Sequence, residues 1–202
     1  MMFLANEKIE SIAYQEVIAA SASDRNTLVV LPTGLGKTII AVMVASIKMK
    51  DDQKILMMAP TKPLASQHCQ TFRAFLKVPK DQLKVMTGDT RPEERYDLWK
   101  DRRGFFATPQ VVENDLISGE VPMQDFSLVI FDEAHRATGD YSYVFINEKM
   151  DVQNLALTAS PGGSKEQIME VAENLDIDNF EVRTEDDPDV EPYIEEKEVN
   201  WI

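Results

Sequence analysis

The sequence contains few residues of the kinds that form cross-links and metal clusters. Its 202 residues include one cysteine, Cys69, and two histidines, His68 and His135. A lone cysteine cannot form an internal disulfide, which fits a reducing compartment, so we expect a cytoplasmic protein. Because no cysteine and histidine residues cluster at metal-ligand spacing, the sequence argues against a zinc site.

Long apolar runs are missing as well. No stretch approaches the ~20 apolar residues that a membrane-spanning helix needs. The opening residues, MMFLANEKIE, lack the basic start and long apolar segment of a secretory signal. We therefore expect no membrane partner. The length of 202 residues, without internal repeats, predicts one domain or one domain with a tail.

Positive charge is scarce, and a net charge of −14 argues against nucleic-acid binding at first sight. The excess is concentrated, however, because residues 164–202 alone carry a net charge of −11 and the rest only −3. One stretch of the body is basic, and it is either a solvated helix face or a surface that contacts phosphates. Its Tyr96 and Trp99 favour local packing over base stacking. The basic residues are Lys77, Lys80, Lys84, Arg91, Arg95, Lys100, Arg102 and Arg103.

Short apolar runs alternate with helical patterns along the chain. This alternation predicts an α/β domain with a mostly parallel sheet and helices on both faces. The predicted strands are residues 26–31, 54–59, 83–86, 104–107, 127–131, 154–157 and 180–183. Clear helical patterns cover residues 7–20, 38–49, 63–76 and 165–174. Residues 184–198 hold eight acidic residues and two prolines, which predicts an exposed exit segment rather than core.

The run LPTGLGKT, from Leu31 to Thr38, has the composition of a phosphate-binding loop. It lies between a predicted strand and helix, which places the positive end of the helix dipole beside a bound anion. We expect Lys37 to reach the β- and γ-phosphates of ATP and the Thr38 hydroxyl to ligate Mg²⁺. The strict pattern has glycine where this chain has Leu31. The residues expected to bind ATP are Pro32, Thr33, Gly34, Leu35, Gly36, Lys37 and Thr38.

The run DEAH, from Asp132 to His135, directly follows the apolar segment SLVIF. A strand there would place it at the same sheet edge as the loop. We expect Asp132 to hold Mg²⁺ through water, and Glu133 to orient and deprotonate the attacking water. His135 is expected to couple hydrolysis to movement rather than to bind metal. By chance the loop pattern occurs in roughly one chain in a hundred and DEAH in roughly one in a thousand, so the pair favours a nucleoside triphosphatase.

With T-P-Q at 108–110 and T-A-S at 158–160, these runs resemble the motifs of superfamily 2 helicases. APTKPL at 59–64, TGD at 87–89, ATPQVVEND at 107–115, FDEAHRATGDYSYVFI at 131–146 and LTASPG at 157–162 are most similar to the archaeal Hef helicase/nuclease group and its eukaryotic relatives FANCM and Mph1. The resemblance implies a RecA-like P-loop NTPase domain at 1–183, the first of two lobes, and an acidic linker at 184–202. It implies the ATP-binding lobe of an ATP-dependent DNA helicase or translocase that acts on forked or branched DNA in the repair of stalled forks.

The same resemblance implies roles for residues outside the two runs. Tyr14 and Gln15 match the element that contacts adenine, although the arginine usual two positions before the tyrosine is Ile12 here. The alternative for Gln15 is a surface helix position. Residues matching nucleic-acid backbone contacts are Thr61, Lys62, Gly88 and Thr108. Thr158 and Ser160 match the motif that links hydrolysis to strand movement, where hydroxyls can bond His135. Ordinary turns are the alternative at all six of these last positions.

Three functions remain open from the sequence. Besides a DNA motor, similar motifs occur in RNA-directed ATPases of the RIG-I or Dicer type, because one lobe displays no reader of the 2′-hydroxyl. A non-catalytic nucleotide-binding scaffold is the third, and intact Lys37, Asp132 and Glu133 argue against it. Motors of this superfamily place ATP between two lobes, and the second supplies arginine fingers. We therefore expect this chain alone to hydrolyse ATP poorly.

Overall fold

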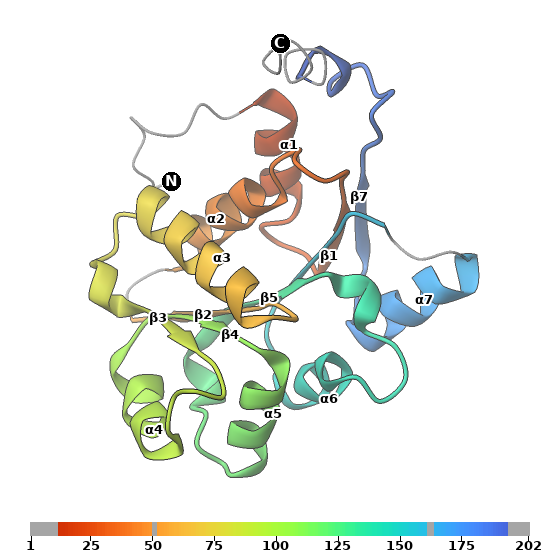
Figure 1. The fold of residues 1–202 in the computed structure, drawn as a ribbon. Coiled ribbons are helices and arrows are strands. Elements are labelled where there is room, and N and C mark those ends of the chain that lie inside the picture. The colour runs from red at the N-terminus through yellow and green to blue at the C-terminus, as the bar shows by residue number, and fades with distance from the viewer. Residues whose placement is uncertain (1–11, 50–51, 161–163, 194–202) are drawn as a thin grey trace.

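The computed structural model describes residues 12–49, 52–160 and 164–193 (Figure 1). Parts of the predicted helix at 7–20 and of the exit segment therefore lie outside the described residues. A seven-stranded, all-parallel sheet forms the centre of the fold, in the order β3-β4-β2-β5-β6-β1-β7. The strands are β1 (Thr27–Val30), β2 (Lys54–Met58), β3 (Leu83–Met86), β4 (Gly104–Ala107), β5 (Phe126–Asp132), β6 (Asn154–Thr158) and β7 (Asn179–Val182).

Helices cover both faces of this sheet, as the alternating sequence pattern predicts. They are α1 (Ala13–Ser21), α2 (Lys37–Lys48), α3 (Lys62–Phe75), α4 (Pro92–Asp101), α5 (Pro109–Ile117), α6 (Ser142–Lys149) and α7 (Lys165–Asn174). Helices α1, α2 and α3 pack on one face, and α4 to α7 pack on the other (Figure 1). The fold prediction is confirmed, and the sheet is more regular than expected because every pairing is parallel.

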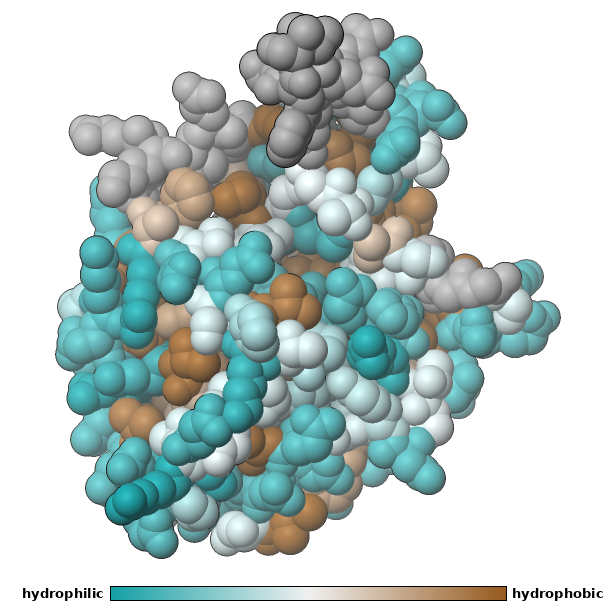
Figure 2. Space-filling model, viewed as in Figure 1, coloured by the Kyte–Doolittle hydropathy of each residue, from teal (hydrophilic) through white to brown (hydrophobic). Residues whose placement is uncertain are grey.

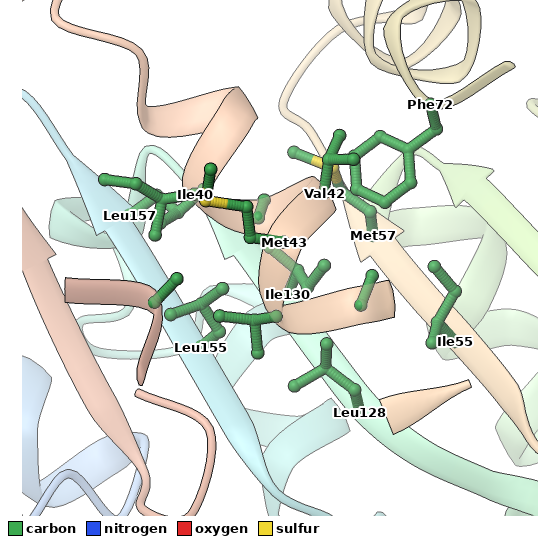
Figure 3. Close-up of a cluster of buried hydrophobic side chains, with 14 of the residues drawn as sticks. Ile40, Val42, Met43, Ile55, Met57, Phe72, Leu128, Ile130, Leu155 and Leu157 are labelled. Atoms are coloured by element: carbon green, nitrogen blue, oxygen red, sulfur yellow. The ribbon is translucent and has the colours of Figure 1, made fainter. Parts of the chain in front are cut away.

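The inner strands are mostly apolar because both of their faces are buried, whereas the edge strand β7 is partly exposed. Successive residues alternate between faces, so in β1 Val29 joins the core under α2, whereas Leu28 and Val30 join the core on the opposite side. Figure 3 shows Ile40, Val42 and Met43 of α2 above strand residues such as Ile130. The sheet is thus packed between two hydrophobic cores, which fix the positions of its strand ends. On the face drawn in Figure 2, apolar residues form small groups among hydrophilic ones, which is ordinary for a protein surface.

The basic stretch is not a uniform solvated face or a uniform phosphate surface. Arg95 is buried and donates bidentate hydrogen bonds to the carboxylate of Asp115, with nitrogen–oxygen distances of 2.6 to 3.1 Å. Trp99 is also buried and donates its indole N–H to Asp115 at 2.9 Å, which confirms local packing for this residue. Tyr96 is exposed, with Lys100 Nζ 3.7 Å from its ring centroid. Arg95 is therefore a structural residue.

The described part of the exit segment, residues 184–193, is mostly exposed but is anchored to the core. Val190 is fully buried in the cluster beneath α1 and α2. Tyr193 packs on the same cluster, and its ring centroid lies 6.1 Å from that of Tyr14. The expectation of a segment wholly outside the core is wrong at Val190, because two apolar residues suffice to hold an acidic segment against an apolar face. The domain boundary at residue 183 remains a prediction.

Candidate functional site

Apart from Tyr14 and Gln15 of α1, every predicted motif lies at the carboxyl end of a strand. Since all seven strands are parallel, these ends meet at one edge of the sheet. The glycine loop, the acidic pair and the T-A-S motif follow β1, β5 and β6, which are neighbours in the sheet. The predicted nucleic-acid contacts follow β2, β3 and β4, which are also neighbours. This edge therefore has two halves: a phosphate-binding half at the ends of β1, β5 and β6, and a nucleic-acid half, with the predicted nucleic-acid contacts, at the ends of β2, β3 and β4.

The loop between β1 and α2 takes the backbone conformations that its glycines permit. Gly34 and Gly36 have φ angles of 87° and 86°, and Gly36 is the N-cap of α2. A Cβ at Gly36 would lie 2.2 Å from Gln15 Nε2, so a side chain here would displace that amide and would also strain the backbone at φ 86°. Leu31, which replaces the glycine of the strict pattern, is buried, and its N–H donates to the Thr158 carbonyl at 3.1 Å. Leucine is tolerated there because its side chain packs into the core cluster under α2.

Two side chains of α1 brace this loop from outside. The Tyr14 hydroxyl donates to the Leu35 carbonyl at 2.7 Å, and Gln15 Nε2 donates to the same carbonyl at 3.3 Å. The Gln15 oxygen accepts the N–H of Ile12 at 3.4 Å. Burial raises the pKa of the Tyr14 hydroxyl above its usual value. Gln15 is only 5% exposed, so the surface-helix interpretation is wrong. Its amide faces the loop, and adenine contact remains a prediction.

Lys37 begins α2 and lies over the loop. Its ammonium group donates to the carbonyls of Leu31 at 2.8 Å and Pro32 at 3.4 Å. Burial lowers the pKa of Lys37, while the nearby carboxylates of Glu133 and Asp132 act in the opposite direction. The structure thus brings the lysine of the loop and the acidic pair to one place, as the two sequence runs predict.

The acidic pair occupies the end of β5 and the residue after it. Asp132 is only 6% exposed, and the Tyr143 hydroxyl donates to its backbone carbonyl at 2.7 Å. Glu133 has a left-handed backbone, with φ 52° and ψ 48°, which is unusual for a residue with a side chain. Such a conformation costs on the order of 1–3 kcal/mol and occurs mostly where function requires it. The turn directs two consecutive carboxylates differently, one buried and one half-buried.

His135 joins the acidic turn to the end of β6. Its Nδ1 lies 3.1 Å from Thr158 Oγ1 and 3.4 Å from Glu133 Oε2. The Thr158 hydroxyl donates to the Ser160 carbonyl at 2.6 Å, and the Ser160 N–H donates back to that hydroxyl at 3.2 Å. Since the hydroxyl proton is committed to Ser160, Nδ1 is the donor toward Thr158. The hydrogen bond expected between the T-A-S motif and His135 is therefore present.

His68 of α3 lies between the two predicted magnesium ligands. Its Nε2 is 2.7 Å from Asp132 Oδ2, and its Nδ1 is 3.5 Å from Thr38 Oγ1, a long contact. In the sequence, this histidine stands out only as an improbable zinc ligand. A signal was available, because the buried positions of α3 are Ala65, His68, Cys69 and Phe72, and one of them carries a polar ring among apolar neighbours.

The oxygen donors fit Mg²⁺. The Thr38 hydroxyl and the Asp132 carboxylate contact opposite ring nitrogens of one imidazole beside the phosphate-binding loop, so an ion held directly by Thr38 would be held by Asp132 through water. Mg²⁺ is usually held by one or two protein oxygens plus phosphates and waters rather than by a protein cage. Consistent with this, the described residues contain no group of three or more His, Cys, Asp or Glu side chains that could hold a metal alone.

The second half of the edge contains the four predicted nucleic-acid contacts. Lys62 Nζ lies 2.6 Å from Asp89 Oδ1, which joins the end of β2 to the TGD turn after β3. Thr61 is the N-cap of α3 and accepts the Leu64 N–H at 3.5 Å, which is the turn role that we held as its alternative. Thr61, Lys62 and Gly88 are exposed, whereas Thr108 is buried at the start of α5.

Two surface cavities, of about 490 and 390 Å³, lie elsewhere on the molecule. They lie at the opposite edge of the sheet, near the amino ends of β2 and β5, and their lining residues include Lys54 and Ser127. No predicted site residue lines either of them. We assign the chemistry to the carboxyl edge because the motif residues contact one another there.

Comparison with known proteins agrees with this geometry. The sequence model of the DEAD/DEAH box helicase family matches residues 12–168. The chain belongs to this family. The matched residues include the loop, the acidic pair and the T-A-S motif.

None of the described helices is long and apolar enough to cross a membrane.

Several helicases are similar to almost the whole chain. A putative ATP-dependent RNA helicase of Methanocaldococcus jannaschii is 47% identical over 92% of this chain. The ATP-dependent DNA helicase mph1 of Neurospora crassa is 43% identical over 94%, and the DEAD-box ATP-dependent DNA helicase Fancm of Drosophila melanogaster is 40% identical over 94%. The crystal structure of the Pyrococcus furiosus Hef helicase domain matches 95% of this chain with a TM-score of 0.91 and 47% identity. The predicted RecA-like helicase fold is confirmed.

This helicase chain spans only part of each relative. It covers 24%, 17% and 14% of the three helicases named above and 42% of the solved Hef chain. The three relatives also differ in the nucleic acid for which they are named: one is named a putative RNA helicase and two are named DNA helicases.

Proposed function

We propose that this chain is the ATP-binding lobe of an ATP-dependent DNA helicase or translocase that acts on forked or branched DNA. The observation that carries the proposal is the convergence of Lys37, Asp132 and Glu133 beside a glycine loop. Each is a group that phosphoryl transfer requires. The likeness to the Hef helicase domain and to DNA helicases of the Mph1 and Fancm type supports DNA as the track.

The residues of the loop have the following roles in this proposal. Backbone N–H groups of the loop bind the phosphates, and Lys37 contacts the β- and γ-phosphates. Thr38 and Asp132 hold Mg²⁺, which supplies charge neutralisation when bound. Glu133 orients and deprotonates the attacking water. Gln15 reads the adenine edge in this scheme, with the fixed Leu35 contact placing its amide beside the loop.

The other half of the edge provides the track for nucleic acid. Thr61, Lys62, Gly88 and Thr108 contact the backbone, so binding is independent of sequence. His135, Thr158 and Ser160 transmit hydrolysis to this half through the hydrogen bonds between β5 and β6. A second RecA-like lobe closes over the ATP and supplies arginine fingers in the longer protein that we propose.

The test is nucleotide binding by matched variants of the chain. Lys37→Ala should abolish measurable binding of ATP in calorimetry, because the loop loses its only ammonium group. Glu133→Gln should bind ATP as the wild type does but lose the residual hydrolysis. Wild-type hydrolysis by Glu133→Gln would refute the catalytic assignment and favour a nucleotide-binding scaffold.

The nucleic acid is tested separately. An RNA-directed ATPase is the second candidate, because one of the similar proteins carries the name of an RNA helicase. Hydrolysis by the longer protein should be stimulated by forked DNA and not by RNA of the same sequence. Stimulation by RNA alone would reverse the assignment without affecting the ATP site.

A further inference from the structure

Among the described residues, His68 is the side chain that contacts both proposed magnesium ligands. Its two ring nitrogens point in opposite directions, one to Asp132 at 2.7 Å and one to Thr38 at 3.5 Å. The side chain is only 8% exposed, as is that of Asp132. This imidazole is therefore a buried bridge between the strand that carries the acidic pair and the helix that follows the loop.

The hydrogen-bond chemistry fixes the direction of this bridge. A carboxylate only accepts hydrogen bonds, so the proton lies on Nε2, which faces Asp132. When the ring carries this one proton, Nδ1 is an acceptor, and the Thr38 hydroxyl is the donor toward it. With its proton directed at His68, the Thr38 hydroxyl keeps its oxygen lone pairs available for a cation. The N–H of His68 also occupies Oδ2 of Asp132, so the other carboxylate oxygen remains available for the ion or its water.

The packing of α3 holds the ring at this place. His68 lies on the buried face of the helix together with Cys69 and Phe72. Phe72 packs edge-to-face on Phe106 of β4, with ring centroids 4.9 Å apart. Because the helix is fixed on the sheet, the imidazole has a defined position before any ligand binds.

We propose that His68 is a positioning residue for magnesium, which orients the Thr38 hydroxyl and the Asp132 carboxylate toward the ion. The inference rests on the proposed ATP site and adds to it a residue that touches neither nucleotide nor metal. Groups that orient metal ligands in this way typically contribute 10- to 100-fold to metal affinity. His68 should therefore matter for the magnesium-dependent part of nucleotide binding and not for the rest.

The experiment measures the affinity of the 202-residue chain for the non-hydrolysable analogue AMP-PNP by calorimetry, with Mg²⁺ and with EDTA. The ratio of the two affinities is the magnesium gain. His68→Ala should lower this gain about tenfold and leave the affinity in EDTA unchanged. His68→Gln, which keeps an N–H donor for Asp132, should retain most of the gain. Gln70→Ala, an exposed change on the same helix, is the matched control and should behave as the wild type.

The outcomes separate this inference from the proposed function. A wild-type gain in His68→Ala overturns the positioning role and leaves the magnesium site standing. An equal loss of affinity with and without Mg²⁺ also overturns it, because it shows a merely structural role. Should the alanine variant not fold, His68→Phe, which fills the space without hydrogen bonds, gives the same comparison. If the wild type itself binds AMP-PNP equally well in EDTA, the magnesium site fails and this inference fails with it.

Discussion

His135 Nδ1 donates a hydrogen bond to Thr158 Oγ1 over 3.1 Å, and the same nitrogen lies 3.4 Å from Glu133 Oε2. Glu133 is the proposed base, and Thr158 ends the neighbouring strand β6. One imidazole thus joins Glu133 to a different strand of the sheet. In the proposed function, a displacement at the γ-phosphate would reach the T-A-S motif through this imidazole.

Thr158→Val removes the hydroxyl at the centre of this arrangement. The buried hydroxyl bonds His135 and both backbone groups of Ser160. We expect a loss of about 1–3 kcal/mol in the free energy of unfolding, measured by urea denaturation, with ATP affinity little changed. Thr138→Val, in the loop after η3 (Ala134–Arg136), is the control. A variant as stable as the wild type would show that these bonds contribute nothing to the fold.

Substitution by alanine should destabilise the protein at one glycine of this edge and have little effect at another. Gly36 has φ 86°, and a Cβ there would meet Gln15 Nε2 at 2.2 Å. Gly36→Ala should therefore cost on the order of 1–3 kcal/mol of stability and weaken ATP binding. Nothing lies within 4 Å of a Cβ at Gly88, so Gly88→Ala should change stability by less than about 0.5 kcal/mol.

Gly88→Ala also tests the nucleic-acid half. If a phosphate approaches this glycine closely, the added methyl group should weaken DNA binding by the longer protein while ATP affinity stays the same. Fluorescence anisotropy with labelled single-stranded DNA measures the effect. Unaltered DNA affinity would favour the interpretation of the TGD run as an ordinary turn.

The buried pair of Arg95 and Asp115 should be important for folding and not for nucleic acid. Asp115→Asn leaves a buried guanidinium without its charged partner, which typically costs about 3–5 kcal/mol. Thermal unfolding measures the effect, and Asp97→Asn, an exposed change on α4, the helix that carries Arg95, is the control. A small effect at Asp115 would mean that water reaches Arg95, contrary to its burial.

Stability should fall in alkaline solution. Burial raises the pKa values of Tyr14, Tyr141 and Tyr143 above 10.0 and that of Cys69 above 9.0. Above these values the folded chain holds protons that the unfolded chain has lost, so stability decreases as pH rises. The lowered pKa of Lys37 acts in the opposite direction, but it is one group against four. Urea denaturation at increasing pH measures the slope, which should be shallower in Tyr143→Phe.

The isolated chain should be a poor enzyme. In related phosphoryl-transfer systems, an arginine finger contributes roughly 10³- to 10⁵-fold to the rate, and in superfamily 2 motors the second lobe supplies these arginines. We expect slow ATP hydrolysis and no strand displacement by the 202 residues. Addition of a second lobe should restore the rate. Robust unwinding of a forked duplex by this chain alone would contradict the proposed division of labour.

The local elements were predictable because their signals are local. Strands β3 and β4 and helix α7 match the predicted ranges at both ends, since apolar runs and the Ser164 N-cap mark them directly. The phosphate loop and the acidic pair were predictable for a similar reason, because each is a continuous run with unusual composition. Their shared edge followed from the parallel sheet.

Contacts between distant side chains were not predictable in this way. His68 and Asp132 are 64 residues apart, and Tyr14 and Leu35 are 21 apart. Arg95 looked like its basic neighbours, although it is buried against Asp115. Val190 lies in a segment that composition marks as exposed, yet it is fully buried.

Local patterns in the chain were enough to predict the alternation of strands and helices, the chemistry of the phosphate loop and the acidic pair, and membership of the helicase family. The position of the α3 imidazole between the two proposed magnesium ligands, and the contact of α1 with the loop, became visible only in the folded protein. The reason is physical: backbone preference and apolar pattern are written in neighbouring residues, whereas the partner of a buried polar group depends on which surfaces the folded sheet brings together.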